Sequence, residues 1–138
     1  MGDYLRGRNL TVSRPLLAGH GTTPEHLAGT TWHDWHACVH ESFEDLQQCC
    51  EEVFVAGFSL GSLLAVHLGV HHRMAGLMLM SPAVWVGDWR VRLLPLARHF
   101  VKFVLKDADL QHSDLTDPEA YQRFWCYDSY PVAPAYQL

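Results

Sequence analysis

A serine between two glycines, at the point where an apolar run meets a helical pattern, constrains this sequence more than any other feature. Residues 53–57 are apolar without alternation, as in a strand that is buried on both faces of a parallel sheet. Apolar residues then recur at helical spacing over residues 60–72. The junction, Gly57-Phe58-Ser59-Leu60-Gly61, matches the pattern G-x-S-x-G. We therefore predict a strand-to-helix turn with Ser59 at its tip, in a backbone conformation outside the usual helical and strand regions.

A serine on such a turn is placed for nucleophilic chemistry. Its hydroxyl stands at the carboxyl edge of the sheet and at a helix N-terminus, where free N–H groups and the helix dipole favour negative charge. The N–H of Leu60 is the candidate donor to an oxyanion. We expect Gly57 and Gly61 to be needed because the backbones of strand and helix nearly touch here. The alternative interpretation is a glycine-flanked turn with an inert serine.

Segments on both sides of this turn indicate an α/β arrangement. Residues 10–17 are typical of a strand that leads into a loop, and residues 76–81 form another unbroken apolar run. Thr31 and Asp34 match the capping box that begins a helix. The order strand, helix, strand, helix, strand is that of two βαβ units. We predict three adjacent parallel strands near residues 10–17, 53–57 and 76–81, with helices over residues 33–50 and 60–72 packed against them.

The sequence changes in character after residue 84. An apolar stretch with a helical period runs over residues 85–105 and predicts either a core helix or a lid. Arg98, Lys102 and Lys106 recur every four residues along it, so we expect a basic stripe that faces solvent or an anionic interface. Beyond this stretch the sequence is rich in turn residues, and we expect no strand after residue 84.

Composition excludes several classes of protein. The 138 residues suffice for one domain, and 49% hydrophobic with 18% charged residues exclude a disordered chain. No apolar run reaches the roughly 18 residues of a membrane-spanning helix, and a net charge of −5 does not favour a nucleic-acid partner. Residues 1–6 are polar and lack the apolar segment of a signal peptide, so we expect none. Since Cys38, Cys49, Cys50 and Cys126 form no C-x-x-C pair, we expect reduced thiols in a cytoplasmic protein.

The ten histidines are more than a chain of this length usually has. Their full protonation would change the formal charge from −5 to +5, so we expect solubility to depend on pH near the pI of about 6.0. His36 and His40 are spaced i, i+4, as are His67 and His71. Neither pair has a third convergent ligand or an H-E-x-x-H motif, so we expect no metal site.

Three stretches, in order, resemble the α/β-hydrolases, and among them the carboxylesterase and monoacylglycerol lipase group. They are residues 10–22 with the Gly-His-Gly loop, residues 30–35 with a threonine–aromatic–x-Asp-Trp helix start, and residues 53–62 with the serine turn. The resemblance covers residues 3 to about 84 well and the remainder loosely. It implies a partial α/β-hydrolase fold: residues 1–84 form the central part of the core, 85–130 a lid, and 131–138 the start of the next core helix.

The resemblance also implies an activity. We expect a serine hydrolase that acts on carboxylic esters through an acyl-enzyme on Ser59, without a cofactor. The expected partner is a small-molecule ester with an apolar acyl group, contacted by Phe58, Trp85 and Trp89. The basic stripe of the lid would give a weak contact with an interface. A serine aminopeptidase or an acyltransferase of the same fold is an alternative.

The resemblance further implies that parts of the catalytic machinery lie elsewhere. In the family the triad acid and histidine follow the serine on later strands, and here both would lie beyond Leu138. We therefore expect a fragment that is inactive by itself. His20, in the Gly-His-Gly loop, is expected to organise that loop and not to act as the base. An inactive truncated relic and a non-catalytic module that binds apolar ligands are the alternatives.

Overall fold

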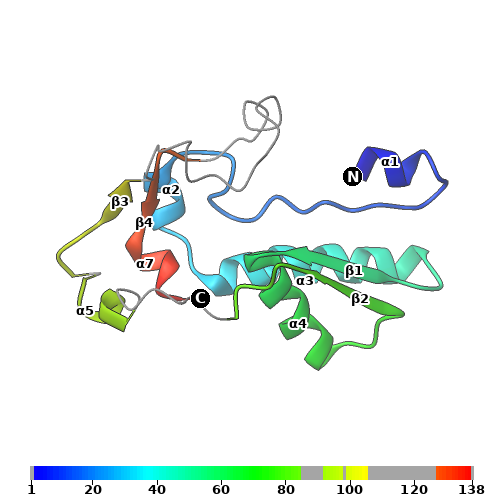
Figure 1. Ribbon diagram of the computed structural model, residues 1–138. Helices are drawn as coiled ribbons and strands as arrows, with labels where there is room; N and C mark the ends of the chain where they lie inside the picture. Colours follow the sequence, from blue (N-terminus) through cyan, green and yellow to red (C-terminus); the bar gives the residue numbers. More distant parts are fainter. Residues whose placement is uncertain (1, 85–91, 98, 106–126, 138) are drawn as a thin grey trace.

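The computed structural model describes residues 2–84, 92–97, 99–105 and 127–137 (Figure 1). Within these ranges it contains two small sheets with helices around them. The elements are, in chain order, α1 (Gly2–Arg6), α2 (Pro24–Ala28), α3 (Trp32–Cys49), β1 (Phe54–Phe58), α4 (Leu60–His71), β2 (Gly76–Met80), α5 (Leu94–Ala97), β3 (Phe103–Leu105), β4 (Ser129–Pro131) and α7 (Val132–Ala135).

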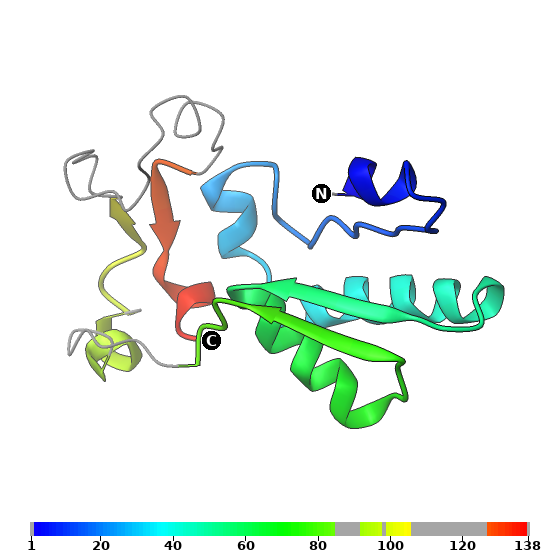
Figure 2. The ribbon, with the colours of Figure 1, turned by 45° about the vertical axis from the view of Figure 1, so that its right-hand side comes forward.

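The first sheet is the parallel pair β1–β2, joined through α4. Its register runs from Phe54 opposite Gly76 to Phe58 opposite Met80. Figures 1 and 2 both show α3 and α4 on the same face of this pair. Two of the three predicted strands and both predicted helices are thus confirmed, with bounds shifted by one residue or so.

Apolar side chains between the layers explain this packing. Phe43 from α3 and Leu68 from α4 are buried together with Val53, which precedes β1. Leu68 has no exposed surface at all, and burial of a whole leucine side chain stabilises a fold by about 1.5–3 kcal/mol. The unbroken apolar run before Ser59 therefore reflects a strand with a helical layer on it.

The start of α3 follows from local chemistry. The Thr31 side chain accepts a hydrogen bond from the N–H of Asp34, and the Asp34 carboxylate accepts one from the N–H of Thr31 at 2.7 Å. This is the predicted capping box. The hydrogen bonds from Thr31 hold the pKa of Asp34 below its usual value of 3.8.

The prediction of a third parallel strand at residues 10–17 is wrong. This segment is extended, but no residue of it joins the β1–β2 sheet. A cavity of about 310 Å³ lies between residues 13–17, α3 and β1. The segment instead contacts α3 through the hydroxyls of Ser13 and Ser42, 2.5 Å apart, and Pro15 has no N–H to give to a ladder. A strand needs a neighbour at hydrogen-bonding distance, and the cavity separates this one from β1.

The expectation of no strand after residue 84 is also wrong. β3 and β4 form an antiparallel pair with Val104 opposite Tyr130. Lys102 lies in a bend directly before β3, and its carbonyl accepts a hydrogen bond from the N–H of Val132 at 3.0 Å. The predicted basic helix is therefore broken at Lys102, while Arg98 and Lys106 lie outside the described residues. Among the described residues between 85 and 130, helical structure is limited to a short turn at residues 92–93 and α5.

The β3–β4 sheet, together with α2 and α7, lies beyond the carboxyl ends of β1 and β2 in both ribbon views (Figures 1 and 2). Tyr127 is buried with Leu27 of α2, Trp35 of α3 and Leu64 of α4. This cluster connects the end of the chain to the helices behind the first sheet. Among the helices of the described ranges, none has both the length and the apolar character needed to cross a membrane.

Candidate active site

Ser59 occupies the turn between β1 and α4. β1 ends at Phe58 and α4 begins at Leu60, so the serine is the one residue between them. Its backbone has φ 51° and ψ −116°, which a non-glycine residue rarely adopts. The N–H of Ser59 donates a hydrogen bond to the carbonyl of Met80 at 3.0 Å, which ties the turn to the end of β2. The strained conformation that the sequence predicts for Ser59 is present.

Gly57 is required by the close approach of β1 and α4. A Cβ atom at this position would lie 2.6 Å from the N atom of Ser62, and closer still to the carbonyl of Gly61. Both obstacles are backbone groups, so no side chain can move aside. The expectation for Gly61 is wrong in this structure, because a Cβ atom there would meet nothing within 4 Å.

The side chain of Ser62 links α4 to the ends of β1 and β2 beneath the turn. Its hydroxyl is fully buried and lies 2.8 Å from the carbonyl of Gly57 and 3.1 Å from the carbonyl of Met80. The single O–H of this side chain on α4 is thus shared between a carbonyl near the end of β1 and the last carbonyl of β2. The sequence indicated only that Ser62 is small. A hydroxyl in the first turn of an otherwise apolar helix is the signal that could have pointed to this role.

The start of α4 places backbone N–H groups beside Ser59, and the N–H of Ser62 donates a hydrogen bond to the Ser59 carbonyl at 3.0 Å. The first N–H groups of any helix have no partner within the helix, and Leu60 holds the first position of α4. The Leu60 side chain packs against the cluster around Trp35. Phe58, on the other side of the serine, is 60% exposed. Trp85 and Trp89, the other expected substrate contacts, lie outside the described residues.

The Gly-His-Gly loop is built around its own hydrogen bonds. The Tyr127 hydroxyl donates to the carbonyl of Gly19 at 2.9 Å and accepts from the N–H of Thr22 at 3.1 Å. Nδ1 of His20 lies 3.2 Å from the carbonyl of Ala18, and its ring stands edge-on to Trp35 at 5.6 Å between centroids. The His20 ring thus contacts its own loop and Trp35 of α3.

Within the described ranges, no histidine or carboxylate side chain forms a hydrogen bond with the Ser59 hydroxyl. The same ranges bring together no three histidine, cysteine, aspartate or glutamate side chains that could hold a metal ion. What the described part of the site assembles is a strained serine, a helix N-terminus and the backbone contacts that hold them in place.

Comparison with known proteins places the chain in a family. The sequence model described as "Alpha/beta hydrolase family" matches residues 2–137, and the chain therefore belongs to the α/β-hydrolase family. Within this family it resembles the carboxylesterase and monoacylglycerol lipase group. It is 43% identical over 75 residues to a thermostable monoacylglycerol lipase of Bacillus sp. (strain H-257), which covers 54% of this chain and 30% of that protein.

Two further similarities extend over more of the chain. A carboxylesterase of Bacillus subtilis (strain 168) is 28% identical over 123 residues, or 86% of this chain and 50% of the esterase. A solved structure described under "LipS and LipT, two metagenome-derived lipolytic enzymes" superposes with a TM-score of 0.80 at 24% identity, over 99% of this chain and 54% of the other. The last similarity concerns the fold alone. The chain spans half or less of the length of the two named relatives.

Proposed function

We propose that this chain contributes the nucleophile of a serine hydrolase that cleaves carboxylic esters. The observation that carries the proposal is the conformation of Ser59, which is held at positive φ between the end of β1 and the start of α4. Such strain persists only where the surroundings enforce it, and here Gly57, Ser62 and Met80 do so.

In the proposed mechanism the Ser59 hydroxyl attacks the carbonyl carbon of the ester. A general base takes the serine proton as a tetrahedral intermediate forms, its oxyanion accepts a hydrogen bond from the N–H of Leu60, and the base returns the proton to the leaving oxygen as the alcohol departs and the carbonyl re-forms. Water then cleaves the acyl-enzyme to release the acid and free Ser59. A serine hydroxyl needs a base for the first step and for the water, and we place that histidine and its acid in the whole protein, outside the described residues.

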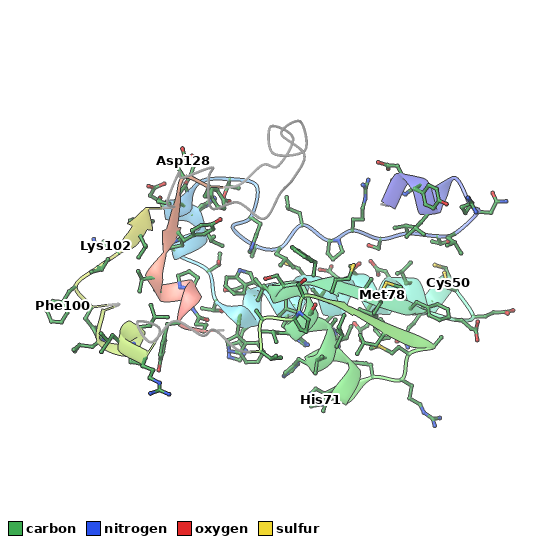
Figure 3. The ribbon with its side chains drawn as sticks, in the orientation of Figure 1. Cys50, His71, Met78, Phe100, Lys102 and Asp128 are labelled. Carbon is green, nitrogen blue, oxygen red and sulfur yellow. The ribbon has the colours of Figure 1, made fainter. Side chains whose placement is uncertain are left out.

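The proposed substrate is a small ester with an apolar acyl group. The names of the two relatives, a monoacylglycerol lipase and a carboxylesterase, support this class. Leu93, Leu96 and Phe100, which follow β2 in the sequence, expose their apolar side chains. Figure 3 shows Phe100 at the outer edge of that region, away from the β1–β2 sheet. Since Cys38, Cys49 and Cys50 are free thiols, we also propose a cytoplasmic location.

Hydrolysis of p-nitrophenyl esters of increasing acyl length tests this proposal. We expect the whole protein that contains this chain to hydrolyse them, and Ser59→Ala to lower kcat at least about 10³-fold. Ser81→Ala is the matched control, because Ser81 also follows a strand at positive φ, and it should leave kcat unchanged. The 138 residues alone should show negligible hydrolysis.

Two results would overturn the proposal. Undiminished hydrolysis by Ser59→Ala would remove the serine from the mechanism. A preference for aminoacyl p-nitroanilides over esters would assign the site to an aminopeptidase instead.

A further inference from the structure

Five histidines meet where α3 lies against α4, away from the Ser59 turn. We call His36 and His40 of α3, His67 and His71 of α4, and His72 at the end of α4 the histidine seam. The rings of His36 and His67 are 4.5 Å apart between centroids, and those of His40 and His72 are 4.8 Å apart. Within each helix, the i, i+4 pairs lie at 5.9 Å and 5.0 Å. Figure 3 shows His71 near the end of α4 that is remote from the strands' carboxyl ends.

The centre of the seam suits neutral imidazole and does not suit imidazolium. Nε2 of His36 and Nδ1 of His67 are both buried and have no hydrogen-bond partner. A protonated ring has an N–H at both nitrogens, so a charge on either residue would leave a buried donor without an acceptor. If a second histidine of the seam were also protonated, its positive charge would lie on a ring next to the first and would repel it.

The titratable groups around His36 add to the cost of protonating it. On α3 the His36 ring contacts the rings of His40 and Trp32, and Trp32 in turn contacts the ring of His33. On α4 the His36 ring faces His67, with His71 and His72 farther along. Among the described residues, the carboxylate paired with the seam is that of Glu44, 3.5 Å from Nδ1 of His40. Glu44 is therefore in contact with the edge of the seam and not with its centre.

We propose that the histidine seam is a proton-sensitive contact, which holds α3 on α4 at neutral pH and loosens as it takes up protons in mildly acidic solution. The inference rests on the ring geometry and is independent of the function proposed for Ser59. Because α4 begins at the Ser59 turn and carries two of the five rings, the contact that loosens is part of the support of that turn.

The direction of the pH effect follows from His36. Burial, and then the nearby His67, His40, His71 and His72, lower the pKa of His36 from its usual value of 6.5. Well above pH 6.5 the ring is neutral in the folded and the unfolded chain, so its titration does not change the free energy of unfolding there. As pH falls below 6.5 the unfolded chain takes up the proton first, so stability decreases until the lowered pKa of the folded state is passed.

The test compares thermal unfolding at pH 7.5 and pH 5.5, both above the range in which Asp34 titrates. The variants are His36→Gln and His67→Gln in the seam, with His26→Gln as the matched control on exposed surface of α2. We expect the midpoint of the unmodified chain to fall by about 3 °C or more at pH 5.5. Either seam variant should reduce that difference by at least half, and the control should not change it.

An imidazole NMR titration of the unmodified chain provides a second measurement that needs no folded variant. We expect the His36 ring to titrate below pH 6.5. Equal pH dependence in the unmodified chain and both seam variants would overturn the proposal, as would titration of His36 at or above pH 6.5. A rise in the midpoint on addition of Zn²⁺ at pH 7.5, lost in His36→Gln, would overturn it in favour of metal binding.

Discussion

Replacement of Gly57 by alanine should destabilise the chain strongly, although it adds a single methyl group. The new Cβ would lie 2.6 Å from the N atom of Ser62 and closer to the carbonyl of Gly61. Overpacking of this kind usually costs about 1–3 kcal/mol. Relief of the clash must move β1 away from α4, which stretches the hydrogen bond that the single Ser62 O–H shares between the carbonyls of Gly57 and Met80, worth about 1 kcal/mol. We therefore expect a loss of about 2–4 kcal/mol in the free energy of unfolding.

Urea unfolding followed by circular dichroism measures this loss, and Gly61→Ala is its control. A Cβ on Gly61 meets open space, and alanine is favoured over glycine within a helix by about 0.5–1 kcal/mol. The two substitutions should thus act in opposite directions, four residues apart on the same turn. Equal effects of Gly57→Ala and Gly61→Ala, or a Gly57→Ala chain as stable as the unmodified one, would refute the close approach of strand and helix.

Two other side chains carry predictions on stability. Ser62→Ala removes the buried hydroxyl that reaches Gly57 and Met80 and should lower the free energy of unfolding by about 1–3 kcal/mol; a neutral result in urea unfolding would contradict the bonds described. Thr31→Ala removes the side chain that caps α3 and should cost about 0.5–2 kcal/mol by the same assay. Since the pKa of Asp34 is lowered by Thr31, the contribution of that carboxylate should be present above pH 3.8 and lost as pH falls below it.

Local patterns predicted the parts of the fold that depend on local chemistry. The capping box at Thr31, the helical period of α4 and the apolar run of β1 all lie within short windows of sequence. The turn at Ser59 is of the same kind, because the G-x-S-x-G pattern lies directly between an apolar run and a helical pattern. These features needed no knowledge of distant contacts.

Pairing and tertiary contacts could not be read in the same way. Residues 10–17 have the composition of a strand, but composition does not determine which strand a segment pairs with. In the structure a cavity separates them from β1. β3 and β4 have three residues each, too short for any period to emerge. The hydroxyl bonds of Ser62 and the contact of His36 with His67 join segments whose proximity exists only in the folded chain.

The role of Ser59 as nucleophile is tested most directly by covalent labelling with a fluorophosphonate, followed by peptide mass spectrometry. The phosphonyl group should be found on Ser59 in the whole protein that contains this chain, and no peptide should be labelled in Ser59→Ala. The 138 residues alone should remain unlabelled, because a serine without its base is an ordinary alcohol. A label on another residue of the whole protein, or robust labelling of the 138 residues alone, would contradict this account.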